Sequence, residues 1–272
     1  MKTKLKSNRT FGVEIEMTHS SKSARTIASL LTAAGLPTSY MGYTHEVVSS
    51  WKLVDDSSIT GGRFKMELVS PVLQNQEGLD QLALALNLIT DLGCKVNMSC
   101  GVHVHVGIND YSVKNLVNLI KFYGKHEEEI DMVVAPSRRN TRWAQSLNIL
   151  SIWENLNRCE TFRDVENLMS TRYKKVNVFS YRRYGTVEFR QHGGSTDVNK
   201  VCQWVVLLTN MCDNVKKKST IQKTKGEFKH SVIDVFGRGQ NRKTMKFFMS
   251  RATSFGFNVE GIFDFAVANR RV

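Results

Sequence analysis

The chain has 272 residues, 41% of them hydrophobic, and carries 38 Lys and Arg against 25 Asp and Glu, a formal net charge of +13. This composition excludes a disordered chain, and no run approaches the ~18 apolar residues that span a bilayer, so we expect no membrane role. The charge favours anionic partners, and five cysteines without CxxC spacing argue against a disulfide framework and favour a reducing cytoplasm.

Hydrophobic periodicity predicts alternating strands and helices in the first half of the chain. In order these are a strand at 10–18, a helix at 23–35, two strands joined by a Gly-Gly turn within 49–73, a helix at 78–93 and a strand at 100–107. Ser23 is the expected N-cap of the first helix, and Gly35 with Pro37 its stop signal.

The second half begins with a predicted helix at 113–134, capped by Asp110 or Ser112. A short helix at 161–169 opens with a capping box formed by Thr161 and Asp164. The remaining predicted elements are a hairpin at 174–194 that turns at Tyr-Gly and an apolar helix at 198–215.

The connections between neighbouring strands decide the expected fold class. Several of them are too short for a parallel crossover, which predicts an α+β fold with an antiparallel or mixed sheet packed against helices. We expect one catalytic domain over residues 1–215. Residues 216–272 are expected to form a basic, helical C-terminal extension that packs on the same domain.

Three of the predicted strands place two polar residues on one face and apolar residues on the other. The pairs are Glu14 with Glu16, His103 with His105, and Glu188 with Arg190, and a fourth strand adds Glu67. A solvent-facing strand explains any single pair, but such faces normally mix Thr, Ser, Lys and Gln. If the strands are neighbours, these carboxylates repel one another unless cations neutralise them.

Ligands of this kind indicate the metal. Several carboxylates with one imidazole suit Mg²⁺ or Mn²⁺ better than structural zinc, and Cys94 and Cys100 do not have the spacing of a zinc finger. An arginine beside such ions is expected where ATP phosphates are bound and transferred. Because the chain has no GxxxxGK[ST] loop, phosphate binding is expected to rely on metals and arginines.

Six segments support a family resemblance. In order along the chain they are GVEIEM, WKLVDDSSI, MELVSP, CGVHVHVG, RYKKVNV and YGTVEFRQHGG. Together they resemble the amidoligase family, within the glutamine synthetase and glutamate–cysteine ligase superfamily. The match runs from Phe11 to Trp204, so the basic C-terminus lies outside it.

The resemblance implies a curved, glutamine-synthetase-like sheet that binds ATP with Mg²⁺ or Mn²⁺. The implied metal ligands are Glu14, Glu16, Glu67, His103 and Glu188. It also implies that Arg190 holds the transferring phosphate and that His105 lies on the nucleotide or substrate side.

Further candidates are charged residues in predicted loops. Arg139 and Arg172, together with Arg138 and Arg142, are candidates to bind phosphate or a substrate carboxylate, and a solvated basic loop is the alternative. Asp56 is a candidate to hold the incoming amine and accept its proton, and a capped turn is the alternative.

The expected function is an ATP-dependent carboxylate–amine ligase that forms an acyl phosphate, with an amino acid, peptide or polyamine as substrate. Two alternatives stay open. One is a metal-dependent hydrolase or cyclotransferase on the same fold, and the other is a nucleic-acid-binding protein that uses the basic C-terminus. A ligase acting on an acidic peptide or a nucleic-acid-linked substrate would use both the carboxylate-rich sheet face and the basic charge of the chain.

Overall fold

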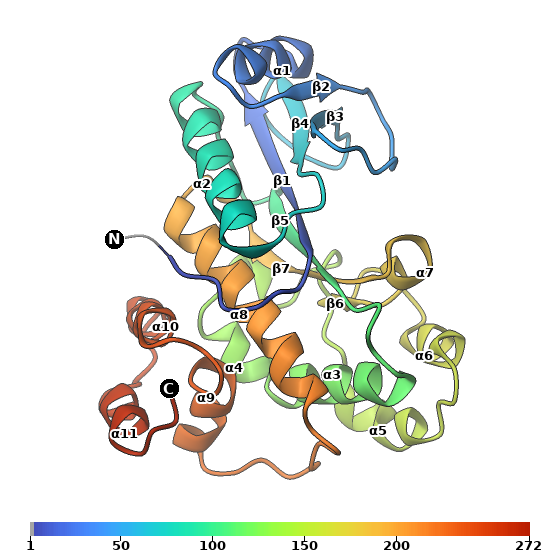
Figure 1. Ribbon diagram of the computed structural model, residues 1–272, viewed down its shortest axis with the longest axis vertical. Helices are drawn as coiled ribbons and strands as arrows, with labels where there is room; N and C mark the ends of the chain where they lie inside the picture. Colours follow the sequence, from blue (N-terminus) through green and yellow to red (C-terminus); the bar gives the residue numbers. More distant parts are fainter. Residues whose placement is uncertain (1–2) are drawn as a thin grey trace.

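The computed structural model describes residues 3–272, which form an α+β fold around one seven-stranded sheet (Figure 1). The strands are β1 Phe11–His19, β2 Thr38–Tyr40, β3 Trp51–Asp55, β4 Phe64–Val69, β5 Gly101–Gly107, β6 Val176–Asn177 and β7 Thr186–Gly193. Their order in the sheet is β2-β3-β4-β1-β5-β7-β6, and only the edge pair β2 and β3 is parallel. The expected antiparallel or mixed sheet is therefore confirmed, as a mixed sheet that is mostly antiparallel.

Helices pack against the sheet and against one another. They are α1 Ala24–Ala33, α2 Asn75–Asp91, α3 Val113–Lys125, α4 Glu127–Asp131, α5 Ile149–Asn157, α6 Phe162–Met169, α7 Ser180–Tyr184, α8 Val198–Lys216, α9 Phe228–Phe236, α10 Arg242–Ser254 and α11 Ile262–Ala268. Helix α1 contacts β2, β3 and β4, and α8 contacts both β5 and α2. Figure 1 shows α2 and α8 alongside the central strands, where they bury the apolar face of the sheet.

The alternation of β1 divides the two faces of the sheet. Val13, Ile15 and Met17 are at most 1% exposed and belong to the core shared with the helices. Since successive side chains of a strand point to opposite faces, Glu14 and Glu16 must lie on the other face. Burial of the apolar face thus determines where the carboxylates point.

Side-chain caps begin several helices where they were predicted. The Ser23 hydroxyl accepts a hydrogen bond in the first turn of α1, and Thr161 and Asp164 form the complete capping box of α6. Ser112, and not Asp110, caps α3, because Asp110 is held by the guanidinium of Arg9 at 2.8 Å.

Two predicted elements differ in the structure. The helix expected at 113–134 is divided at His126, whose φ and ψ of −105° and 18° leave the helical range. The hairpin expected at 174–194 does contain two antiparallel strands, β6 and β7, but α7 connects them. Gly185, predicted in the turn, ends α7 with a φ of 65° that glycine adopts readily. Strand β2 and helix α5 have no counterpart among the predicted elements.

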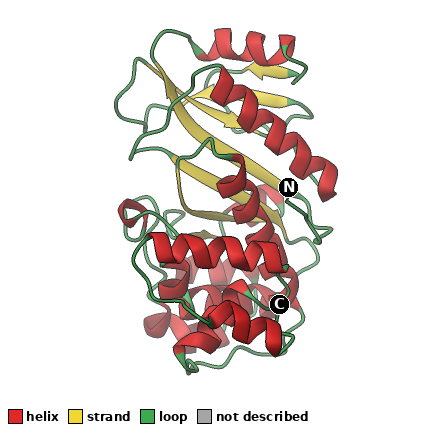
Figure 2. Ribbon diagram, turned by 90° about the vertical axis from the view of Figure 1, so that its left-hand side faces the viewer, coloured by secondary structure: helices red, strands yellow, loops and turns green. Residues whose placement is uncertain are grey.

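The last part of the chain consists of helices that share the main core. Trp204 of α8 and Phe248 of α10 are buried with ring centroids 6.4 Å apart, and α9 contacts α4. Figure 2 shows the sheet at one end of the molecule and most helices gathered at the other. Within residues 3–272, no helix has the length and apolar content needed to cross a membrane.

Candidate active site

The strand register brings the predicted polar residues together on one face. Glu14 of β1 lies opposite His103 of β5, and Glu16 lies opposite Glu67 of β4. The acidic strand is therefore flanked by the histidine strand on one side and by the second acidic strand on the other. Three motifs distant in sequence become one row of side chains.

The row continues across β7 and β6. His105 of β5 lies opposite Glu188 of β7, which in turn lies opposite Asn177 of β6. The opposite face of β7 is apolar at Val187 and Phe189, which are fully buried. The same alternation that orients β1 therefore directs Glu188 toward the histidines.

A cleft of about 620 Å³ lies over this row. Its charged and histidine lining residues are Glu14, Glu16, His45, Glu46, Lys52, Asp55, Asp56, Glu67, His103, His105, Arg138, Arg172 and Arg190. The loop from β2 to β3 covers part of the cleft, since His45, Glu46 and Val47 also line it. The Tyr184 hydroxyl holds this loop by donating to the carbonyl of His45 at 3.0 Å.

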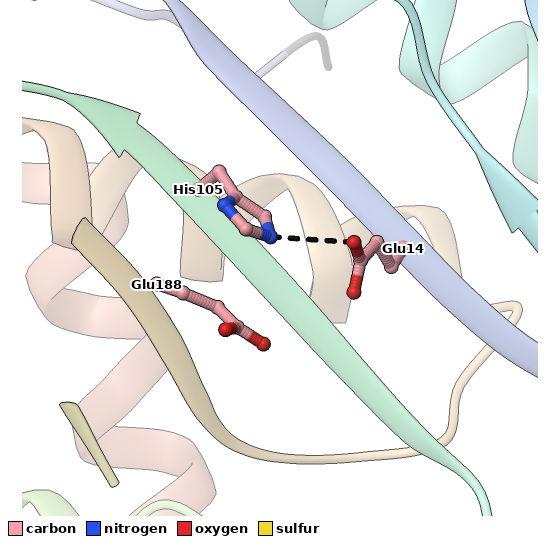
Figure 3. A group of neighbouring side chains, drawn as sticks. All are labelled: Glu14, His105 and Glu188. Atoms are coloured by element: carbon pink, nitrogen blue, oxygen red, sulfur yellow. Dashed lines mark ion pairs between the residues drawn. The ribbon is translucent and has the colours of Figure 1, made fainter. Parts of the chain in front are cut away.

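Glu14, His105 and Glu188 converge from three neighbouring strands (Figure 3). One ligand atom from each lies within 4.8 Å of the others, and Nε2 of His105 is 3.3 Å from Oε1 of Glu14. The other ring nitrogen, Nδ1, is 3.1 Å from the Thr186 hydroxyl. Two carboxylates and an imidazole at this spacing can hold a single divalent cation.

His103 is enclosed by the same carboxylates. Only 5% of the residue is exposed, and its Nδ1 lies 3.1 Å from Glu14 and 3.6 Å from Glu188. Its Nε2 lies 3.6 Å from Glu16, whose Oε2 also accepts a 2.6 Å hydrogen bond from the amide of Gly101. Both histidines thus reach acidic partners, and the assignment of His103 to metal and His105 to nucleotide stays a prediction.

The carboxylates of the row have opposite electrostatic environments. Burial raises the pKa of Glu14, but His105 and His103 outweigh that effect and hold the pKa well below its usual range. Burial, followed by the charges of Glu14 and Glu16, raises the pKa of Glu67 well above its usual range. Among residues 3–272 no hydrogen bond or ion pair neutralises Glu67. The donor set therefore fits a hard divalent cation, which would offset this repulsion.

Two residues hold Glu188 in place. Its Oε1 pairs with Nη1 of Arg190, and its Oε2 accepts a 2.5 Å hydrogen bond from Nδ2 of Asn177. Arg190 is fixed further by donating from Nε to the carbonyl of Trp143 at 3.2 Å. Asn177 was not predicted as a site residue, although it is the polar member of an otherwise apolar VNV segment.

The structure distinguishes among the predicted arginines. Arg172 lines the cleft, where its guanidinium contacts the Tyr173 hydroxyl at 3.2 Å. Arg139 does not reach the cleft lining, because its guanidinium packs over the rings of Phe255 and Phe257 at 5.5 and 5.2 Å.

Arg138, the candidate next to Arg139, does line the cleft. It is 4% exposed, and its Nη2 donates to the carbonyl of Arg190 at 2.9 Å. Its buried Nε has no partner in the part of the chain described, 3–272. Because Arg138 lines the cleft and forms no ion pair within these residues, its positive charge is available to an anionic ligand.

The end of β3 supplies the remaining charged groups. Asp56 lines the cleft, and its Oδ1 accepts a 2.8 Å hydrogen bond from the amide of Ser58, as in the capped turn considered above. Lys52, which was not predicted as a site residue, also lines the cleft. A lysine between the apolar Trp51 and Leu53 was the available signal.

Comparison with known proteins agrees with this geometry. The family model described as "Putative amidoligase enzyme" matches residues 7–212, which include all the sheet strands and every charged residue of the cleft lining. Comparison with curated proteins finds no match. Since the family model covers most of the chain, the protein belongs to the amidoligase family.

Proposed function

We propose that this amidoligase-family protein is an ATP-dependent carboxylate–amine ligase. The γ-phosphoryl group of ATP passes to a substrate carboxylate, giving ADP and an acyl phosphate. An amine or ammonia then attacks the acyl carbon, loses a proton and expels inorganic phosphate, which leaves an amide. The carboxylate substrate is an amino acid or peptide, and the amine is an amino acid, ammonia or a polyamine.

The observation that carries the proposal is the row of carboxylates and imidazoles beside three arginines in one cleft. Glu14, Glu16, Glu67, Glu188 and a histidine would hold Mg²⁺ or Mn²⁺. When bound, such ions supply positive charge to the phosphate oxygens.

The protein's own groups align the reactants. Arg190, fixed by Glu188 and Trp143, would donate to the transferring phosphoryl group and stabilise its developing charge. Arg172 and Arg138 would orient the substrate carboxylate for in-line attack. Asp56, at the rim, would bind the amine and accept its proton.

The proposal also includes the type of fold, the cellular location and the charge of the substrate. The mostly antiparallel sheet with its acidic face is consistent with a glutamine-synthetase-like catalytic fold. A cytoplasmic location is consistent with the five cysteines, all of which are free. The net charge of +13 is consistent with an acidic peptide or nucleic-acid-linked substrate.

Release of ADP tests the proposal. Wild-type protein with Mg²⁺ and ATP would be screened against amino acids, polyamines and acidic peptides in pairs, and we expect ADP to form only with a matching pair. Glu188→Ala should abolish turnover, whereas Glu260→Ala, which removes an exposed carboxylate of the C-terminal extension, should leave it unchanged. Turnover that survives Glu188→Ala would refute the proposal.

Two further measurements on the wild type and Glu188→Ala separate the alternatives. Cleavage or cyclisation of a substrate with metal but without ATP would favour a hydrolase or cyclotransferase. Tight, salt-dependent binding of nucleic acid that survives Glu188→Ala would favour a nucleic-acid-binding protein.

A further inference from the structure

The cleft has two chemically different ends, which we call the valine end and the arginine end. The valine end consists of Val47, Val48, Val69, Pro71 and Val72, with Lys52 among them. The arginine end consists of Arg138, Arg172 and Arg190, with Trp143 and Tyr173 beside them. Glu14 and Glu16 of β1 lie between the two ends, because β1 separates β3 and β4 from β5 and β7 in the sheet.

The strand register places Lys52 at the valine end. Lys52 of β3 lies opposite Val69 of β4, which lies opposite Glu14 of β1. Because β3 and β4 are antiparallel, Val48 before β3 and Val72 after β4 extend toward the same edge. Val69 therefore separates Lys52 from Glu14 on the sheet, and the side chain of Lys52 lines the cleft among the apolar residues, where the charges of Glu14 and Glu67 act on it.

Lys52 is a buried cation that forms no ion pair within residues 3–272, although the charges of Glu14, Glu67 and Glu46 favour its protonated form. It is 4% exposed, and its Nζ donates to the backbone carbonyl of Glu46, the one hydrogen bond it makes within residues 3–272. An ammonium group has three donors, so two remain for a ligand. Buried charges are costly unless they are paired, which makes an anionic ligand the natural partner.

Charge also decides which ligand lies at which end. The acyl substrate carries a carboxylate, which suits the guanidinium groups of Arg138 and Arg172, because each makes a hydrogen bond to a neutral group but no ion pair within residues 3–272. A nucleotide base is flat and uncharged, so the valine end suits it better. Its phosphates would then run past Lys52 toward the acidic row and Arg190.

We infer that Lys52 binds the phosphate chain of the nucleotide and that the base lies at the valine end. This inference rests on the proposed function, because it presupposes a nucleotide in the cleft. The acyl substrate consequently enters from the arginine end, and phosphoryl transfer takes place between the two.

Binding measurements on two variants test both parts. A non-hydrolysable ATP analogue and inorganic tripolyphosphate, each with Mg²⁺, would be titrated into wild type, Lys52→Met and Val72→Trp by calorimetry. Lys52→Met removes a charged hydrogen-bond donor and should weaken both ligands roughly 10- to 100-fold. Val72→Trp fills the valine end with an uncharged ring and should weaken only the ATP analogue, by about 10-fold or more.

The controls keep the outcomes distinct. Lys65→Met removes a β4 lysine outside the cleft lining and should bind both ligands like wild type. Val72 is 64% exposed, so its replacement should not prevent folding, and thermal unfolding would confirm this for every variant.

Each part of the inference has its own refuting result. Normal affinities in Lys52→Met would overturn the phosphate contact, and loss of tripolyphosphate binding in Val72→Trp would overturn the placement of the base. If the wild type bound neither ligand, the proposed ligase function would fail as well.

Discussion

Asn177 should determine the metal affinity of the cleft although it is not itself a predicted metal ligand. It is 4% exposed, and its side chain is fixed at both ends. Nδ2 donates to Glu188 at 2.5 Å, and Oδ1 accepts from the amide of Phe179 at 2.9 Å. Replacing Asn177 by Ala would leave Oε2 of Glu188 without its hydrogen bond, so that only Oε1 is held, by Arg190 and by His103 at 3.6 Å.

The expected magnitude follows from the kind of bond removed. Groups that orient a metal-binding carboxylate typically contribute a factor of roughly 10–100 to metal affinity. A hydrogen bond to a charged group also contributes about 1.5–3 kcal/mol to stability. Asn177→Ala should therefore weaken Mn²⁺ binding by roughly 10- to 100-fold and lower the free energy of unfolding.

The affinity of each variant for Mn²⁺ is measured by titration with Mn²⁺, with calorimetry or electron paramagnetic resonance as the readout. Asn118→Ala is a matched control, because Asn118 is 3% exposed and donates to the carbonyl of Lys218 at 3.0 Å, remote from the cleft. It should lose stability without losing Mn²⁺ affinity. Equal Mn²⁺ affinity in Asn177→Ala and wild type would refute the reasoning.

Two further predictions concern stability. Burial and then Arg251 lower the pKa of His192 to about 4, so the unfolded state, with a pKa near ~6.5, binds a proton first as the pH falls. Between pH 7.5 and 4 the free energy of unfolding of the wild type should therefore fall by about 3 kcal/mol more than that of His192→Gln. Urea unfolding at each pH measures both, and an equal fall in the two proteins would contradict the prediction. Lys175, 2.8 Å from Glu127 and 2.7 Å from Asp131, is fully buried. Lys175→Met should lower the free energy of unfolding at pH 7, measured with urea, by about 3–5 kcal/mol, because it leaves two carboxylates without their partner. A decrease below ~1 kcal/mol would show that this buried ion pair is not essential for stability.

Local patterns were sufficient for much of the fold. Apolar residues at every second position identified β1 and β5, and the capping box of Thr161 and Asp164 identified the start of α6. Both signals come from residues a few positions apart, whose interactions form within one element. The break at His126 was missed because helical periodicity continues on both sides of it.

The candidate site, like the fold, was predictable from local patterns only in part. Alternation alone placed Glu14 with Glu16, and His103 with His105, on one face of their strands. It could not distinguish Arg138 from Arg139, adjacent residues of which one reaches the cleft and the other packs on Phe255 and Phe257 of the C-terminal region.

The sequence by itself therefore determined the elements, the polarity of each strand face and the family resemblance. Tertiary structure decided the strand order that joins those faces, the bond from Asn177 to Glu188 and the burial of Lys52 at the valine end. The physical reason is distance along the chain. Periodicity is set by the geometry of one strand, whereas register between segments such as β1 and β5 depends on side-chain packing and hydrogen bonds formed only on folding.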